Sequence, residues 1–441
     1  MALDRHRRRA TLGLIWCLYF VQGLPFGFLT KTVRALVYEH PEYGSRSAAT
    51  LVTGLALPWL LKLLWAPLVD RYHRPRWGRR KSWLVPTQLL LSASLAGGAI
   101  AADRSLPALL LAVFVMNVFA ATLDIAVDGL AVDCLAERDL GHGNAAQVVG
   151  YKLGMLAGGG FILYLTKFVS VSVSLSVAAL LVAGVAVLTM RFEEPPSPTP
   201  HRAIRGVVAQ LKSVVTLPGT AWLLLAVATY KTGEAIVDGL FTPLVLDAGF
   251  EKWQLGKWDS IYGQSSSILG SLGGGYVATR LPLLRALAAT ACARIVPLVG
   301  MLALGHGVDV SGDVSSIMVI AAMSAEHFFG GALTTVMFAF MMSQVDPRIG
   351  ATHFTLLASV EVLGKTPTGL LSGVAADALG YTAPFAAAVI LSVVYLLVLV
   401  PLRREASFTV IASAGKPPAA SGRSEILAEE PDPDEMPSKD G

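Results

Sequence analysis

Apolar runs of about 20 residues or more recur along the whole sequence, and this feature constrains the fold more than any other. A run of that length lets an α-helix cross roughly 30 Å of membrane hydrocarbon. The composition agrees, because 54% of the 441 residues are hydrophobic and only 15% are charged, whereas a soluble domain carries about 25% charged residues. The sequence therefore predicts an all-α membrane protein with many spans.

These runs predict about twelve membrane spans in two sets of six. The first set covers roughly residues 11–33, 46–69, 83–103, 106–135, 144–167 and 170–191, and the second roughly 220–246, 254–279, 282–305, 312–344, 350–377 and 381–402. Two sets of six around a linker are the plan of the major facilitator fold, whose halves are structural repeats. We therefore expect two six-helix halves, over residues 1–192 and 219–404.

The segments outside the spans predict no soluble catalytic domain. A linker over 193–218 begins with a proline-rich stretch, and its apolar residues at helical spacing over 204–215 predict a short helix on the membrane surface. The tail over 405–441 is rich in Pro, Ser and charged residues, which predicts disorder. Lys and Arg concentrate in alternate loops and near both ends, so the positive-inside rule places both termini in the cytoplasm.

Partners and cofactors are constrained by what the sequence lacks. Cys17, Cys134 and Cys292 are isolated and fit neither a disulfide framework nor a metal site, so we expect no metal and no cofactor. The net charge of +4 comes from basic loops rather than from one basic face, which argues against a nucleic-acid partner. We expect a monomer whose partners are the lipid bilayer, a small-molecule substrate and a coupling ion.

Ionisable side chains at membrane depth are costly and therefore mark candidate functional positions. Asp124 and Asp128 lie four residues apart and share one face of the predicted fourth span, while Lys231, Glu234 and Asp238 form a stripe across the seventh. Spans one, four, seven and ten line the central cavity of the major facilitator fold, and Gln22 lies on the first. We assign these six residues to a substrate path.

Ion coupling is the chemistry that these residues suggest. A carboxylate in a dry cavity can take up and release a proton near neutral pH, and histidine titrates in the same range. The candidate proton carriers are Glu234, Asp238, Glu326 and His327. Lys231 would bind an anionic substrate group when unpaired, or keep Glu234 ionised when paired.

Three further charges, Lys152, Glu361 and Lys365, form a secondary buried group. Glu361 and Lys365 lie one helical turn apart. They either neutralise each other structurally or belong to the path.

A second constellation follows the second span. Asp70 stands at a helix end before a dense basic loop, and it is placed to pair across the cytoplasmic face and hold the two halves together. The positive-inside rule explains the arginines of this loop but neither Asp70 nor Gly78. We expect a gating latch made of Lys62, Asp70, Arg71, Gly78, Arg79 and Arg80.

Three stretches together resemble one branch of the major facilitator superfamily. They cover residues 19–27 (YFVQGLPFG), 57–72 (LPWLLKLLWAPLVDRY) and 121–129 (ATLDIAVDG), and residues 150–154 and 230–235 also look like that branch. It holds the bacterial AmpG-like muropeptide permeases and the eukaryotic acetyl-CoA transporters. The resemblance implies proton-driven import of anhydro-muropeptides across the bacterial inner membrane, for cell-wall recycling. The sequence departs from the family at Leu123, where Gln is common, and at Lys152, where Arg is frequent.

The expected function is therefore secondary active transport of a polar, anionic solute by alternating access, with an anhydro-muropeptide as the first choice of substrate. Acetyl-CoA, another organic anion or a peptide remain alternative substrates. A polytopic membrane enzyme or a membrane sensor without transport are alternatives of another class. Short loops and the lack of a nucleotide-binding, metal-binding or acyltransferase motif disfavour an enzyme.

Overall fold

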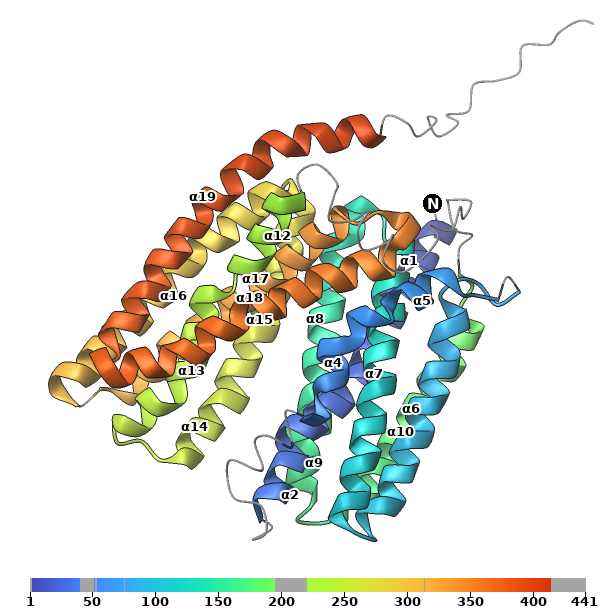
Figure 1. The fold of residues 1–441 in the computed structure, drawn as a ribbon, viewed down its shortest axis with the longest axis horizontal. Helices are drawn as coiled ribbons and strands as arrows, with labels where there is room; N and C mark the ends of the chain where they lie inside the picture. The colour runs from blue at the N-terminus through green and yellow to red at the C-terminus, as the bar shows by residue number, and fades with distance from the viewer. Residues whose placement is uncertain are drawn as a thin grey trace, which may run out of the picture.

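The computed structural model of the chain describes residues 2–39, 51, 54–74, 76–194, 220–312 and 314–413. Nearly all of these residues are helical, and they form two bundles that lie side by side (Figure 1). The predicted linker helix and the tail beyond residue 413 lie outside the described residues.

The first bundle comes from the N-terminal half. Its helices are α1 (Ala2–Gly27), η1 (Phe28–Val33), α2 (Arg34–Glu39), α4 (Leu57–Leu61), η2 (Lys62–Leu64), α5 (Ala66–Arg71), α6 (Lys81–Ala102), α7 (Leu106–Cys134), η3 (Glu137–Asp139), α8 (Leu140–Leu156), η4 (Ala157–Phe161), α9 (Ile162–Leu165) and α10 (Val171–Arg191). The π-helical turns η1 and η4 lie in contact with each other and continue α1 and α8 without a break in the chain direction.

The second bundle comes from the C-terminal half. Its helices are α12 (Thr220–Thr229), α13 (Thr232–Asp247), α14 (Lys252–Trp258), the π-helical turn η5 (Asp259–Gly263), α15 (Gln264–Arg280), α16 (Leu283–Ser311), α17 (Ser316–Ser343), η6 (Pro347–Ile349), α18 (Gly350–Leu379) and α19 (Thr382–Ser413). The last helix continues past the predicted end of the twelfth span.

Eight helical stretches of the described chain are long and apolar enough to cross a membrane. Helices also occupy the other four predicted spans, but these are interrupted or more polar. Prolines 58 and 67 divide the second span, and the seventh breaks between α12 and α13. The eleventh, α18, carries Glu361, Lys365 and Asp377. The fold is the predicted all-α membrane architecture.

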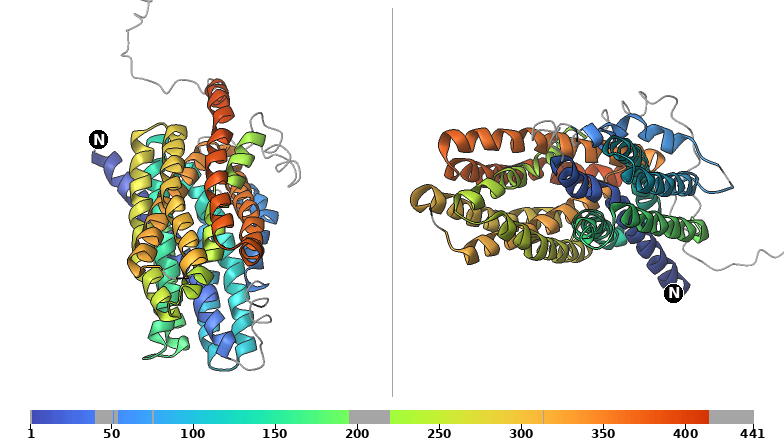
Figure 2. Two further views of the ribbon diagram at one scale, coloured as in Figure 1. Left: turned by 90° about the vertical axis from the view of Figure 1, so that its left-hand side faces the viewer. Right: turned by 90° about the horizontal axis from the view of Figure 1, so that it is seen from below.

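The two bundles meet at the end of the molecule that carries the N-terminus, which we call the N-terminal face. There α8 packs against α15 and α17, and α18 packs against α5 and α7. A Cβ atom added to Gly141 of α8 would lie only 2.4 Å from the carbonyl oxygen of Gly275 in α15, so these helices are in backbone contact. The ribbons converge at this face and diverge toward the opposite one (Figures 1 and 2).

The outer surface of the bundles is apolar, as a lipid-facing surface must be. Leu180, Val310, Ile317 and Leu397 are each more than two-thirds exposed. Charged residues at mid-helix positions, such as Asp124, Arg294 and Glu326, are instead buried.

Candidate functional site

The N-terminal half holds a buried ion pair between Lys62 and Asp124. The Lys62 ammonium contacts one carboxylate oxygen of Asp124, and the side-chain amide of Gln22 donates to the other. All three side chains are buried. The cation and the amide together compensate the charge of Asp124, which is the condition under which a carboxylate is tolerated at this depth.

Asp128 lies one turn further along α7 and has a different environment. It is only 2% exposed, and it accepts a hydrogen bond from the phenol of Tyr19. No cation forms an ion pair with it in the described ranges of the chain. Asp128 is thus a buried carboxylate whose closest partner is a neutral hydroxyl.

Glycines position Tyr19 and Gln22 by bringing α1 close to α8. A Cβ atom on Gly154 would lie 2.0 Å from the carbonyl oxygen of Phe20, and one on Gly23 would lie 2.4 Å from that of Tyr151. Only glycine allows this approach of the two backbones. The polar face of α1 is therefore fixed against α7.

Three partly exposed aromatic rings lie beside the Lys62–Asp124 pair. Phe26 and Trp59 have ring centroids 5.4 Å apart, and Tyr151 lies 6.2 Å from Phe26 and 6.4 Å from Trp59. The Lys62 ammonium lies 5.7 Å from the centroid of Trp59, whose indole N–H donates to Asn117 at 2.8 Å. We call Phe26, Trp59 and Tyr151 the aromatic triad.

The C-terminal half holds a second buried ion pair, between Lys231 and Glu361. The seventh predicted span is not continuous, because α12 ends at Thr229 and α13 begins at Thr232. Lys231 lies in this break, and its ammonium is 2.9 Å from Glu361 of α18. Lys365, one turn beyond Glu361, lies 3.6 Å from the same oxygen. Broken helices of this kind line binding sites in transporters.

A third group centres on Arg294 of α16, a buried guanidinium that contacts two carboxylates. It donates to Glu326 of α17 and lies 3.3 Å from Glu234 of α13. His327 adds to this group, with one ring nitrogen 3.2 Å from Glu326 and the other 3.3 Å from Asp259 of η5. We call these residues the Arg294 cluster.

Two predicted residues lie outside these pairs. Asp238 of α13 is exposed and makes no ion pair with any residue of the described ranges. Lys152 of α8 donates to Ser267 of α15 and so connects the two halves.

The predicted path residues do not form one cluster. Asp124 and Asp128 find their partners inside the N-terminal half, so they do not pair with Lys231, Glu234 or Asp238. Lys231 pairs with Glu361 rather than with Glu234, because the helix break separates Lys231 from the stripe that an unbroken helix would form. Lys62, which we expected in the latch, instead lies on Asp124.

Sequence reasoning did not single out Tyr19 or Asp259, and it gave Arg294 only a structural or gating role. A buried arginine within a long apolar run needs a carboxylate partner, but the sequence does not say that Glu326 and Glu234 supply it. Nothing local in the sequence distinguishes Tyr19 from a core tyrosine. In the described residues, no group of three or more His, Cys, Asp or Glu side chains is placed to hold a metal.

Asp70, at the end of α5, connects the two halves at the N-terminal face. Its carboxylate accepts from the backbone and hydroxyl of Thr352, both at 2.7 Å, and from the backbone of Ala351 at 3.3 Å. Arg79 and Arg80 hold the same carboxylate from the other side, at 3.0 and 2.9 Å. Asp70 thus joins its own loop to the start of α18.

The basic loop reinforces this contact. Arg79 donates to the carbonyl oxygens of Pro347 and Arg348, at 3.1 and 2.7 Å, so a second side chain crosses between the halves. Arg80 is fully buried and also pairs with Asp133 at 2.6 Å. Burial alone would lower the pKa of the Arg80 guanidinium, but Asp133 and Asp70 outweigh it and raise that pKa above its ordinary value.

Gly78 and Arg71, the other predicted latch residues, have different roles. Gly78 has a φ of +94°, which favours glycine, and a Cβ atom there would lie 2.5 Å from the carboxylate of Glu194. That carboxylate accepts from the backbone N–H groups of Arg80 and Lys81, both at 2.9 Å, and so caps α6. Arg71 is exposed and stacks on Tyr72 at 5.3 Å, so it is not part of the contact between halves.

Comparisons with known proteins agree with this architecture. The family model described as acetyl-coenzyme A transporter 1 matches residues 11–175. The anhydromuropeptide permease of Escherichia coli K12 is 30% identical over 403 residues, which cover 90% of this chain and 80% of the permease.

Solved structures show the same fold. A human organic anion transporter superimposes with a TM-score of 0.68 at 16% identity, over 89% of this chain and 99% of that one. The Escherichia coli fucose:proton symporter gives a TM-score of 0.66 at 14% identity, over 88% and 97%. These relatives are transporters and not enzymes. The chain belongs to the anhydromuropeptide permease family of major facilitator transporters.

Proposed function

We propose that this transporter is a proton-coupled importer of anhydro-muropeptides in the bacterial inner membrane, acting as a monomer. The observation that carries the proposal is the division of buried charge between the halves. Each half balances most of its charge internally, through Lys62–Asp124 in one and through Lys231–Glu361 and the Arg294 cluster in the other. Asp128 remains buried, and no described residue forms an ion pair with it.

Asp128 is our candidate for the proton carrier. Burial penalises an ionised carboxylate unless a positive charge compensates it. Lys62 already serves Asp124, so a proton is the available counter-charge for Asp128. The Tyr19 hydroxyl can donate to the ionised carboxylate or accept from the protonated one, which supports both states of a carrier. Asp238 in the other half, which is exposed and forms no ion pair with any described residue, is the second candidate.

The aromatic triad supports a substrate that contains sugar rings. Pyranose rings present C–H groups that pack on aromatic faces, while their hydroxyls need hydrogen-bonding groups nearby. Phe26, Trp59 and Tyr151 are partly exposed and offer such faces, whereas the neighbouring Gln22 and Asp124 are buried and bonded to each other. Lys152 and Lys365 are both partly exposed, and their ammonium groups would suit the carboxylates of the peptide part of such a substrate.

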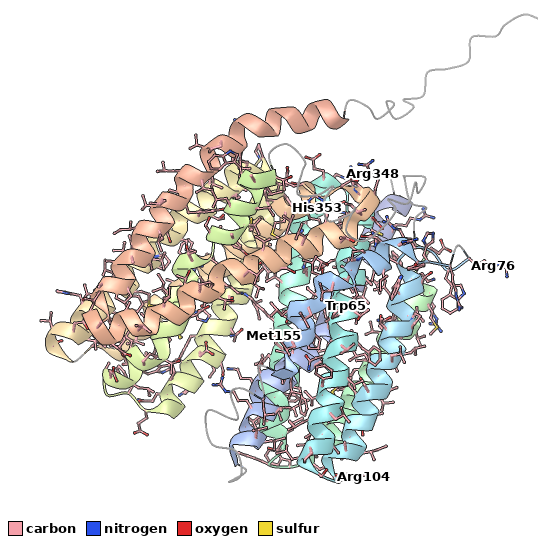
Figure 3. The ribbon with its side chains drawn as sticks, viewed as in Figure 1. Trp65, Arg76, Arg104, Met155, Arg348 and His353 are labelled. Atoms are coloured by element: carbon pink, nitrogen blue, oxygen red, sulfur yellow. The ribbon has the colours of Figure 1, made fainter. Side chains whose placement is uncertain are left out.

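Import is supported by the closed N-terminal face. Arg76 and Arg348 lie at this face and Arg104 lies at the opposite one (Figure 3). The basic N-terminus and the basic loop at residues 71–81 also belong to the N-terminal face, which the positive-inside rule assigns to the cytoplasm, together with both termini. With the Asp70 contacts holding the two halves together at that face, release of solute to the cytoplasm requires the latch to open.

A second candidate substrate is acetyl-CoA or another organic anion. The family model that matches residues 11–175 supports it, as do the cations Lys152 and Lys365.

Uptake into proteoliposomes tests the proposal. The purified full chain is reconstituted, an inward-directed proton gradient is imposed, and accumulation of a radiolabelled anhydro-muropeptide is compared with that of a dipeptide and of acetyl-CoA. We expect gradient-dependent uptake of the anhydro-muropeptide alone. Uptake of acetyl-CoA alone would replace the substrate by the second candidate, and uptake unaffected by a protonophore would refute proton coupling.

A further inference from the structure

A pocket of about 430 Å³ lies on the N-terminal half near the N-terminal face. It is lined by the end of α5 and its following loop (Tyr72, His73, Arg74), by the first half of α6 (Ser82, Trp83, Pro86, Thr87, Leu90) and by one face of α7 (Val118, Phe119, Thr122). Its size is within the range of small-molecule pockets, about 300–1,000 Å³. No residue of the charge networks described above lines it.

The pocket faces away from the substrate path. On α7, Val118, Phe119 and Thr122 share one face, whereas Asp124 follows Thr122 by two residues, or about 200° around the helix. Leu90, nine residues beyond the start of α6, lies roughly 14 Å deeper than Lys81 at 1.5 Å per residue. Leu90 is nearly half exposed, so the pocket runs from the N-terminal face down the lipid-facing surface.

Two arginines lie at the polar end of this pocket: Arg74 lines it, and Arg71 stacks on the lining residue Tyr72. Arg71 and Arg74 are exposed, and each stacks on a neighbouring ring, at 5.3 Å from Tyr72 and 5.7 Å from Trp77. Neither forms an ion pair with a residue in the part of the chain that the structure describes. The loop is held in place, because the Arg74 backbone donates to Ser82 at 2.9 Å and the Trp83 indole donates to the Tyr72 carbonyl.

We propose that this pocket binds an anionic phospholipid of the adjacent leaflet. An apolar groove along the lipid-facing surface fits an acyl chain, and the two guanidiniums at its polar end, which have no ion-pair partner among the described residues, fit a phosphate-bearing headgroup. Basic pockets between membrane helices on the cytoplasmic side are known to take anionic lipids. The occupant lies directly against the loop that carries Arg79 and Arg80, so it contacts the segment that joins the two halves.

Quenching of tryptophan fluorescence by brominated lipids tests the proposal on the full chain. The protein is reconstituted in phosphatidylethanolamine vesicles that contain an equal fraction of brominated phosphatidylglycerol or brominated phosphatidylethanolamine. The Trp83 signal is the difference between the unsubstituted chain and Trp83→Phe. We expect the glycerol lipid to quench Trp83 preferentially. Arg74→Gln should reduce that preference about fivefold, and Arg71→Gln with Arg74→Gln about twentyfold.

Arg280→Gln is the matched control, because Arg280 ends α15, is exposed and stacks on Tyr276 at 5.1 Å, yet lines no part of the pocket. It should keep the full preference. Equal quenching of Trp83 by both lipids would overturn the proposal. So would an unchanged preference in the double arginine variant, or an equal loss in Arg280→Gln.

Discussion

Asp70→Asn should release the contact between the two halves without changing the shape of the side chain. The carboxylate accepts five hydrogen bonds, from Arg79, Arg80, Ala351 and twice from Thr352. One of its oxygens takes both bonds from Thr352, at 2.7 Å each. The asparagine amide has only one oxygen. If that oxygen keeps the bonds to Arg79 and Arg80, the NH₂ group faces the backbone N–H and the hydroxyl of Thr352, and both bonds to Thr352 are lost.

The expected magnitude follows from those two lost bonds. Hydrogen bonds to a charged group are worth about 1.5–3 kcal/mol each, so the loss is about 3–6 kcal/mol before relaxation. The lower end corresponds to a shift of roughly a hundredfold or more in the equilibrium between closed and open N-terminal faces. The fold itself should persist, because the amide oxygen can keep the bonds to Arg79 and Arg80 within the N-terminal half, and the bonds that are lost lie between the bundles.

Electron–electron distance measurements provide the assay. Spin labels are attached at positions 191 and 280, which end α10 and α15 at the N-terminal face of the two halves and are both exposed. Cys17, Cys134 and Cys292 are replaced by serine beforehand, since all three are free thiols. We expect a single short distance in the unsubstituted chain and a longer, dominant one in Asp70→Asn.

Asp346→Asn is the matched control for Asp70→Asn. Asp346 also carries several hydrogen bonds at this face, but its carboxylate bonds to Arg348 within its own loop. It should leave the distance distribution unchanged. A distribution in Asp70→Asn that matches the unsubstituted chain would refute the assignment of Asp70 to the latch.

Three further predictions concern charge pairs and helix contacts. Lys231→Met should lower the free energy of unfolding by about 3–5 kcal/mol, because it leaves the buried Glu361 with only the more distant Lys365. Adding Glu361→Gln should restore much of that stability. Thermal unfolding in detergent measures both variants, and equal stability of the single and double variants would contradict the ion pair. Gly275→Leu should keep the N-terminal face open, because a Cβ atom at this position would already lie 2.7 Å from Ala145. Gly273→Leu should leave the face closed, because the nearest atom to a Cβ there is 3.8 Å away. The same spin-label distances test both variants, and an equal response would contradict the prediction. Lys62→Ala should disrupt the N-terminal half and abolish substrate binding, because it leaves the buried charge of Asp124 without a cation, whereas Lys62→Ala with Asp124→Asn should again give a folded protein. Calorimetric titration with an anhydro-muropeptide measures binding, and size-exclusion profiles report folding. Unchanged binding by Lys62→Ala would contradict the prediction.

The architecture could be predicted from the sequence because every span must be long enough to cross the same thickness of bilayer. The ranges of α7, α10 and α18 agree with the predicted spans to within a few residues, since each begins and ends where apolar residues give way to polar ones. The latch loop could also be predicted from the sequence. Asp70 and Gly78 stood out because orientation rules explain arginines but explain neither an acid nor a glycine.

The pairing of the buried charges could not be predicted, because it depends on helix rotation and on a helix break. The break lies at Tyr230 and Lys231, just before Gly233, but glycine is common throughout these spans and does not by itself mark a break; in the structure Lys231 pairs with Glu361. Arg294 and Glu326 lie on different helices and meet only through packing. Spacing along one helix, which grouped Lys231 with Glu234, has no information about such contacts.

Asp128→Asn tests the central claim most directly, through two transport modes in the same proteoliposomes. Proton-driven accumulation requires the carrier to bind and release a proton, whereas counterflow exchange of labelled for unlabelled substrate requires only that loaded carrier change conformation. We predict that Asp128→Asn abolishes gradient-driven accumulation of the anhydro-muropeptide and retains counterflow, because the amide mimics the protonated carboxylate beside Tyr19. Undiminished gradient-driven accumulation in Asp128→Asn would contradict the account.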